Sequence, residues 1–90
     1  MKNIDFMMNY VKEYLDGKKE RWEFDLDFDH ELTKRWGKMR REDSEYAEVF
    51  YDWISEDGVD AGEGLSDSAY KKLIRRQYNE VKSIAASGFF

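Results

Sequence analysis

Residues 22–30 read WEFDLDFDH, an unbroken alternation of large apolar or aromatic residues with acids that ends on the only histidine of the chain. Successive side chains of a β-strand point to opposite faces, so a period of two is typical of a strand. The alternation therefore predicts one short β-strand or extended segment over residues 21–28. Its apolar face would comprise Trp22, Phe24, Leu26 and Phe28. Its acidic face would comprise Glu23, Asp25, Asp27 and Asp29, with Glu31 extending the row.

A strand needs a partner for its backbone N–H and C=O groups. No second convincing strand is present, because segment 49–54 and the tail at 88–90 are both poor candidates. In one interpretation the predicted strand pairs with its own copy across a two-fold axis and forms a homodimer. In the other it is an extended segment that packs across the helices of one monomer. The sequence leaves both interpretations open.

The rest of the chain has apolar residues at helical spacing. Helices are expected over residues 4–16, about 29–41, about 44–57 and about 67–86. The predicted N-caps are Asn3, Asp29, Asp43 or Ser44, and Ser66 or Ser68. Three glycines between residues 58 and 64 indicate a flexible loop over 57–66. We therefore expect a mainly α fold of about four helices, in a single small domain spanning residues 1–90.

The composition excludes several classes of site and location. The chain has no cysteine, so it forms neither a disulfide nor a thiolate metal site. It has no proline, so helices can run without forced breaks. No stretch approaches 18 apolar residues, and the first residues lack the apolar run of a signal peptide. We therefore expect no membrane association and a cytoplasmic location.

Two metal-binding motifs begin near the alternating segment, and neither is complete. Asp25, Asp27 and Asp29 match the first three ligand positions of a calcium-binding EF-hand loop. The sixth position of that loop needs glycine and is His30, and the twelfth needs glutamate and is Trp36. His30 also opens a zinc-protease motif, but the second histidine is missing. We expect no metal, no cofactor and no enzymatic activity.

Charge is unevenly distributed along the chain. Residues 1–65 carry 10 basic and 18 acidic residues, a net charge of −8, whereas residues 66–90 carry 5 basic and 2 acidic residues, a net charge of +3. The basic residues of the C-terminal helix, about 67–86, fall within an arc of about 140°. They are Lys71, Lys72, Arg75, Arg76 and Lys82. This face is either a solvated surface that balances acids of the same chain or a surface that contacts nucleic-acid phosphates.

The acidic row suggests a basic protein as the partner. Alternate strand residues stand about 6.7 Å apart, a spacing of the same order as that of phosphates along a nucleic-acid strand. Such a row would fit a phosphate-binding groove on another protein, and its alternative role is to keep the surface soluble. In size and charge the chain resembles small proteins carried by bacterial phages and mobile elements, many of which bind and modulate larger proteins. We expect a small acidic, non-enzymatic protein-binding module that acts as a regulator or inhibitor. The alternative is a nucleic-acid-associated module that uses the basic C-terminal helix.

Overall fold

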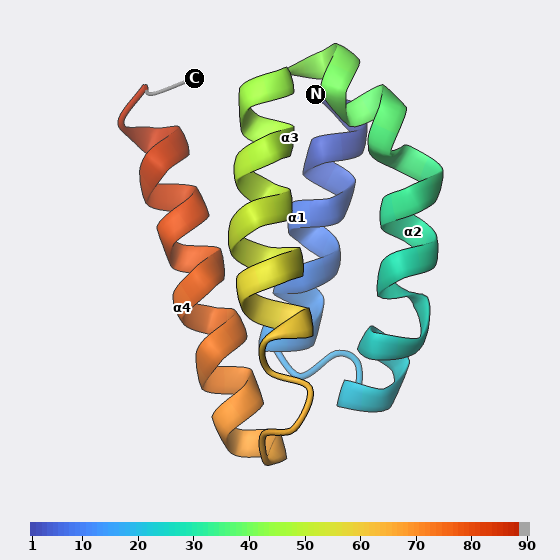
Figure 1. Cartoon of the computed structure of the whole chain (residues 1–90), viewed down its shortest axis with the longest axis vertical. Coiled ribbons are helices and arrows are strands. Elements are labelled where there is room, and N and C mark those ends of the chain that lie inside the picture. Colours follow the sequence, from blue (N-terminus) through green and yellow to red (C-terminus); the bar gives the residue numbers. More distant parts are fainter. Residues whose placement is uncertain (89–90) are drawn as a thin grey trace.

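The computed structural model describes residues 1–88 as helices that run alternately down and up (Figure 1). The elements are α1 (Lys2–Leu15), α2 (Arg21–Glu42), α3 (Ser44–Phe50), the π-helix η1 (Tyr51–Asp60) and α4 (Asp67–Ala86). Because η1 continues α3 without a break, the two form one rod, which lies in front of α1 between α4 and α2 (Figure 1). The prediction of a mainly α fold is confirmed. Phe89 and Phe90, part of the tail considered as a strand partner, lie outside the described residues.

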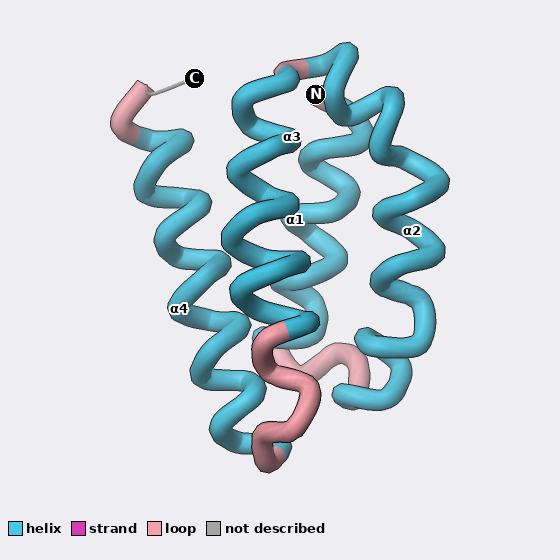
Figure 2. Tube along the Cα trace, in the orientation of Figure 1, coloured by secondary structure: helices cyan, strands magenta, loops and turns pink. Residues whose placement is uncertain are grey.

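The predicted strand over residues 21–28 is wrong, because these residues form the first turns of α2. No strand occurs in the part of the chain that the structure describes (Figure 2). A period of two also contains every fourth residue, which is the spacing of one helical face. Phe24 and Phe28 use that spacing to enter the core, and Leu32 follows one turn later. A helix pairs its backbone groups internally, so the segment needs no strand partner, and the homodimer loses the support of strand pairing.

The start of α2 explains why a helix forms here. The backbone N–H of Glu20 donates to the Glu23 carboxylate at 3.1 Å. The N–H of Phe24 donates to the carbonyl of Glu20 at 3.0 Å. An acid three residues after the first capping residue is a known signature of a helix start. Asp29 therefore lies inside the helix, and the predicted N-cap at this residue is wrong.

Two of the other helix starts follow the prediction. Asp43 caps α3 and Ser66 caps α4, each by accepting a hydrogen bond from an N–H of the first turn, at 3.0 and 3.3 Å. Asn3 is not an N-cap, because it lies within α1. The carboxylate of Glu42 accepts hydrogen bonds from the N–H groups of Asn3 and Ile4 at 2.8 and 2.9 Å. The last residue of α2 thus satisfies the first turn of α1.

The core is an aromatic and aliphatic cluster shared by all the helices. Its largest fully buried side chains are Tyr70, Phe24, Phe28, Phe50, Ile4, Met7, Met39, Ile54, Ile74, Val11 and Val81. The ring of Phe24 stacks on Tyr14 of α1 with centroids 4.6 Å apart. Phe28 stacks on Phe50 of α3 at 6.2 Å. Burial of these rings decides which side of α2 faces inward.

The loop before α4 is shorter than predicted. The π-helix extends to Asp60, so the connection spans residues 61–66 rather than 57–66. Gly62 packs against Tyr70, and a Cβ at this position would lie 2.6 Å from Tyr70 Cδ1. Glycine therefore lets this connection lie directly against the first turn of α4.

Candidate functional site

A groove of about 500 Å³ lies between α2 and η1. We call its seven lining residues the acidic groove: Asp29, Leu32, Thr33, Trp36, Tyr51, Ser55 and Asp60. The rings of Trp36 and Tyr51 lie 5.3 Å apart across it, at an angle of 50°. Asp29 comes from α2 and Asp60 from η1. The groove thus combines aromatic faces with two carboxylates.

Regular helical spacing brings the residues of α2 to this groove. Asp29, Leu32, Thr33 and Trp36 stand at positions i, i+3, i+4 and i+7, which share one face of an α-helix. Leu32 is buried and belongs to the core, whereas Trp36 is half-buried and contacts Tyr51 of the opposite wall. The groove is therefore supported directly by the core beneath it.

The π winding of η1 places the other three residues. In an α-helix, which turns by about 100° per residue, Asp60 would point about 180° away from Tyr51. In a π-helix each N–H bonds to the carbonyl five residues earlier, so one turn takes more than four residues. Tyr51, Ser55 and Asp60 consequently reach the same groove. Segments of π-helix are frequent at functional sites.

Contacts with α4 hold η1 in this form. The side-chain amide of the buried Gln77 donates to the carbonyl of Asp57 at 3.2 Å. Gly58 lies so close to α4 that a Cβ would stand 3.2 Å from Ile74 Cδ1. The Gln77 amide gives a backbone carbonyl of the widened helix a hydrogen-bond partner. The missing side chain at Gly58 lets η1 approach α4 closely. Both contacts stabilise the packing of η1 on α4.

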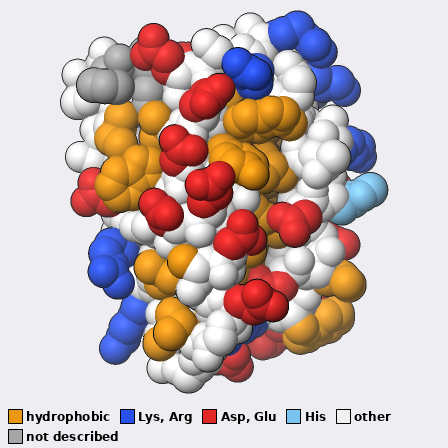
Figure 3. Space-filling model, in the orientation of Figure 1, with side chains coloured by type: hydrophobic (Ala, Val, Ile, Leu, Met, Phe, Trp, Pro, Cys, Tyr) orange, Lys and Arg blue, Asp and Glu red, His pale blue; other side chains and the backbone are white. Residues whose placement is uncertain are grey.

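A second hollow of about 270 Å³ continues the acidic groove toward residues 61–66. It shares Asp29 and Asp60 with the groove and adds Asp25, Val59 and Glu63. Figure 3 shows this side of the molecule, on which red carboxylates lie among exposed orange side chains. Negative charge therefore extends beyond the groove itself.

Acids are also concentrated in a stretch outside the alternating segment, which supplies Asp60 and Glu63 to these hollows. Residues 42–70 contain ten acids and no lysine, arginine or histidine. The acids are Glu42, Asp43, Glu45, Glu48, Asp52, Glu56, Asp57, Asp60, Glu63 and Asp67. Of the seven residues that line the acidic groove, the sequence prediction named only Asp29 as a site residue. It missed Leu32, Thr33, Trp36, Tyr51, Ser55 and Asp60. The run of acids without a basic residue at 42–70 was a readable signal of an acidic surface.

The structure divides the predicted acidic row between two sides of α2. On a helix, alternate residues are about 200° apart. Glu23, Asp27 and Glu31 therefore lie on one side of the buried stripe, and Asp25 and Asp29 lie on the other. A regular row at strand spacing does not form.

Three of these five acids contact their own chain. Glu23 caps α2, Glu31 pairs with an arginine one turn later at 3.3 Å, and Asp25 binds a tyrosine of α4 at 2.6 Å. Asp27 and Asp29 are exposed, and neither forms an ion pair with another residue in 1–88. Only Asp29 of these two lines the acidic groove.

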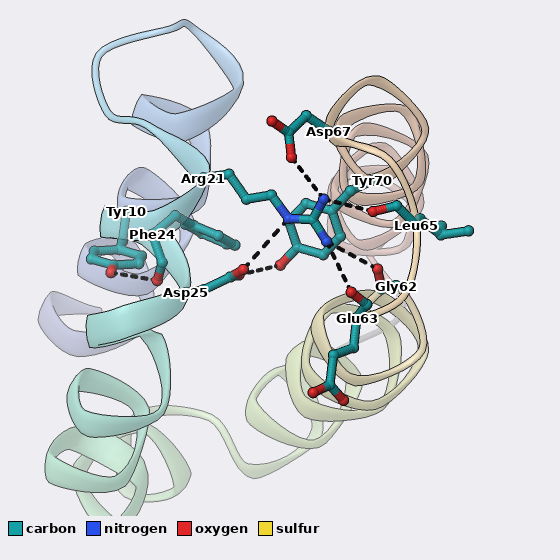
Figure 4. Close-up of polar contacts among 9 residues, drawn as sticks. All are labelled: Tyr10, Arg21, Phe24, Asp25, Gly62, Glu63, Leu65, Asp67 and Tyr70. Carbon is teal, nitrogen blue, oxygen red and sulfur yellow. Dashed lines mark hydrogen bonds and ion pairs between the residues drawn. The ribbon is translucent and has the colours of Figure 1, made fainter.

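Asp25 belongs to a cluster around Arg21 that joins α2 to residues 61–66 and to α4 (Figure 4). The Arg21 guanidinium donates to the carbonyl of Leu65 at 2.7 Å, to the Asp67 carboxylate at 2.9 Å and to two more loop carbonyls. The Tyr70 hydroxyl donates to Asp25 Oδ1 at 2.6 Å. Burial raises the pKa of Tyr70, and the bond to Asp25 raises it further, so the hydroxyl stays protonated. Asp25 therefore has a structural role.

The four apolar residues predicted for one strand face point in two directions. Phe24 and Phe28 are fully buried, whereas Trp22 and Leu26 are 67% and 70% exposed. Trp22 and Leu26 stand one turn apart on the outer side of α2. The predicted common apolar face is wrong, because two residues along a helix turn the side chain by about 200°.

The five predicted basic residues lie on α4, and three of them contact their own chain. Arg75 donates to the last carbonyl of α1 at 3.1 Å. The ammonium groups of Lys71 and Lys82 lie 5.2 and 5.7 Å from the centres of tyrosine rings. Lys72 and Arg76 are exposed and form no ion pair with another described residue.

Within residues 1–88, no three histidine, aspartate or glutamate side chains are grouped so as to hold a metal ion. In the same range, none of the helices has both the length and the apolar character needed to cross a membrane. His30 does not line the acidic groove, which offers carboxylates, hydroxyl groups and aromatic faces. Comparisons with protein-family models, with curated proteins and with solved structures give no match.

Proposed function

We propose that this protein is a small acidic, non-enzymatic protein-binding module whose acidic groove takes a cationic side chain of a basic partner protein. One observation carries the proposal: the carboxylates of Asp29 and Asp60 share a groove with the aromatic pair Trp36 and Tyr51. No lysine or arginine lines this groove. Arg40 lies 6.0 Å from the Trp36 ring, at the limit of a cation–π contact, and pairs instead with an acid of α3.

The chemistry of the groove favours arginine over lysine. A guanidinium is planar, donates to carboxylates through several N–H groups at once and stacks on aromatic rings. An ammonium is a strongly hydrated point charge. A cation over an aromatic face contributes about 0.5–1 kcal/mol at an exposed site, and more when water is excluded. A carboxylate beside that face adds a charge-assisted hydrogen bond.

The charge of the whole molecule supports the same class of partner. The net charge is −5, and the stretch that supplies η1 has ten acids and no basic residue. A field of this sign attracts a basic protein and accelerates its association. Salt should weaken the binding, because the Debye length falls from about 10 Å at 0.1 M to about 3 Å at 1 M ionic strength.

Calorimetric titration with a short peptide of alternating arginine and glycine tests the proposal. We expect the wild-type protein to bind this peptide more tightly than the lysine–glycine analogue. The double variant Asp29→Asn/Asp60→Asn should bind it at least about tenfold more weakly, a loss of about 1.4 kcal/mol.

The matched control is Glu45→Gln/Glu80→Gln, which removes the same charge from exposed positions outside the groove. It should change the affinity by less than about threefold, as expected of screened surface charges. Equal losses in the two double variants would mean that binding follows total charge, and the groove would not be the site.

A module of this kind acts by occupying a surface of its partner. The resemblance in size and charge to small proteins of phages and mobile elements supports a role as a regulator or inhibitor of a larger cytoplasmic protein. Inhibition should then follow occupancy of the acidic groove, and the Asp29→Asn/Asp60→Asn variant should inhibit more weakly than the control variant.

The alternative function is a nucleic-acid-associated module that uses α4. The exposure of Lys72 and Arg76 favours it, because both are available for phosphates. Retention on a heparin column that falls steeply with salt, and that is lost in Lys72→Gln/Arg76→Gln but kept in the groove variant, would favour this function over the proposed one.

A further inference from the structure

The outer side of α2 carries the most exposed large apolar side chains among the described residues. Leu26 is 70% and Trp22 67% exposed, and they stand one helical turn apart. His30 continues the same line one turn later. Neighbouring exposed apolar side chains mark a contact surface more strongly than a single one does. Neither Trp22 nor Leu26 lines the acidic groove.

Charge along α2 is polarised from end to end. Residues 20–31 contain six acids and one basic residue, whereas residues 32–41 contain five basic residues and no acid. The right-hand edge of Figure 3 shows this polarity, because blue side chains lie above the pale blue histidine and orange and red ones lie below it. Such a helix is complementary in charge to a second copy that runs in the opposite direction.

We infer that two copies of this chain form a dimer through the outer sides of their α2 helices, packed antiparallel across a two-fold axis near the middle of the helix. In the register that sets Leu26 opposite the partner's Gly37, Trp22 stands opposite the partner's Arg41. An arginine over a tryptophan ring is a favourable cation–π pair. A two-fold axis makes each of these contacts twice.

The flank of this contact supplies ion pairs. Asp27, Lys34 and Lys38 fall within an arc of about 40° beside the Trp22–Leu26 line. All three are exposed, and none pairs with another residue in 1–88. Across the two-fold axis, Asp27 of one copy lies between Lys34 and Lys38 of the other. The dimer therefore uses charges that the monomer leaves unpaired.

Gly37 supports the same register. Glycine is unfavourable in the middle of a helix compared with alanine. Among residues 1–88 nothing requires a glycine at this position, because a Cβ at Gly37 would meet only the end of the Arg41 side chain, at 3.7 Å. In the dimer a second helix approaches closely and places its Leu26 against Gly37. This close approach explains why residue 37 is a glycine.

Sedimentation velocity of the full chain from micromolar to millimolar concentration tests the inference. A contact through one helix per subunit lies at the small end of specific interfaces, near 1,200 Å² in total, so we expect reversible, concentration-dependent dimers. A wild-type protein that stays monomeric over the whole range would overturn the inference.

A charge exchange then tests the register. Asp27→Lys alone and Lys34→Asp alone should each weaken dimerisation at least about tenfold, because each sets like charges opposite one another twice. The double variant Asp27→Lys/Lys34→Asp has the net charge of the wild type and should restore dimerisation to within about threefold. A dimer whose double variant is as weak as the single variants would contradict the antiparallel pairing.

Two further variants separate this surface from folding. Trp22→Ala/Leu26→Ala should abolish dimerisation while leaving the circular dichroism of the monomer unchanged, because both side chains are exposed. Gly37→Ala should make the helix more stable and the dimer weaker. Undiminished dimerisation in either variant would show that the two copies meet elsewhere.

Discussion

Phe24 and Leu26 are two residues apart in the chain and point to opposite sides of α2. Phe24 is fully buried between rings of α1 and α4, whereas Leu26 is 70% exposed. A strand would have placed both side chains on one face. Their contribution to the stability of the monomer therefore distinguishes the helix from the strand directly.

We predict that Phe24→Ala lowers the free energy of unfolding by about 3–5 kcal/mol, because it leaves a cavity in the aromatic core. Leu26→Ala should change it by less than about 0.5 kcal/mol, as expected of an exposed side chain. Urea denaturation in dilute solution, where the chain is monomeric, measures the free energy of unfolding of each variant. Similar losses for the two variants would support the strand instead.

The carboxylate of Glu42 makes the stability of the fold depend on pH in the acidic range. Its partial burial opposes ionisation, but hydrogen bonds from Ile4 and Asn3 outweigh this effect, so the pKa of Glu42 lies below its ordinary value of 4.5. A depressed pKa in the folded state contributes stability above pH 4.5, and this contribution is lost as the pH falls through the folded-state pKa.

We predict that Glu42→Gln lowers the melting temperature at pH 7, and that the difference from wild type narrows as the pH falls below 4.5. The reason is that protonation removes from the wild type the charge that the variant already lacks. Glu45→Gln, at an exposed position of α3, is the control and should lie close to the wild type at pH 7. A difference for Glu42→Gln that stays constant from pH 7 to pH 3 would refute this linkage.

At the scale of elements, the position of η1 depends on close packing against α4. The connection at 61–66 has no side chain at Gly62, where a Cβ would lie 2.6 Å from Tyr70 Cδ1 and 2.9 Å from the carbonyl of Gly58. Both neighbours belong to rigid helices, so they cannot move without disturbing η1 or the core. The acidic groove depends on the same packing.

We predict that Gly62→Ala lowers the free energy of unfolding by about 1–3 kcal/mol, because of this overlap. Gly64→Ala is the matched control, since nothing lies within 4 Å of a Cβ at that position. It should leave stability unchanged or raise it slightly, by restricting the unfolded chain. Chemical denaturation measures the free energy of unfolding of both variants. Equal values would show that Gly62 is not closely packed.

The helices with regular apolar spacing could be predicted from sequence, because that spacing reports one buried face. The first half of α2 could not be predicted from its alternation, which fits a strand and a helix equally. Two weaker signals favoured the helix. Residues 21–28 contain no β-branched residue and two aspartates, which are rare in strands. The acids at 20 and 23 are also spaced as in a capping box.

The acidic groove was only partly predictable. Asp29 was identified as part of an acidic row, but nothing in the local pattern joins Asp29 or Trp36 to Asp60. These residues come together because α2 packs beside η1 and because residues 51–60 form a π-helix. No periodicity in the sequence of residues 51–60 predicts a π-helix. Long-range packing of this kind is set by the whole core.

At the scale of the molecule, charge is arranged on separate surfaces. The side formed by α3, η1 and residues 61–66 is acidic, and α2 carries opposite charges at its two ends. α4 carries all five lysines and arginines of the last third of the chain. A molecule with these surfaces offers the acidic groove to a basic partner and the outer side of α2 to a second copy.

The most direct test of the acidic groove is a nitrogen-15 NMR titration of the wild-type protein with the arginine–glycine peptide. The three tryptophan indoles are internal probes, because Trp36 lines the groove, whereas Trp22 and Trp53 do not. We predict that the largest shift changes occur at the Trp36 indole and at backbone amides of residues 29–36 and 51–60. Changes confined to α4, or equal changes at all three indoles, would contradict the assignment of this groove as the binding site.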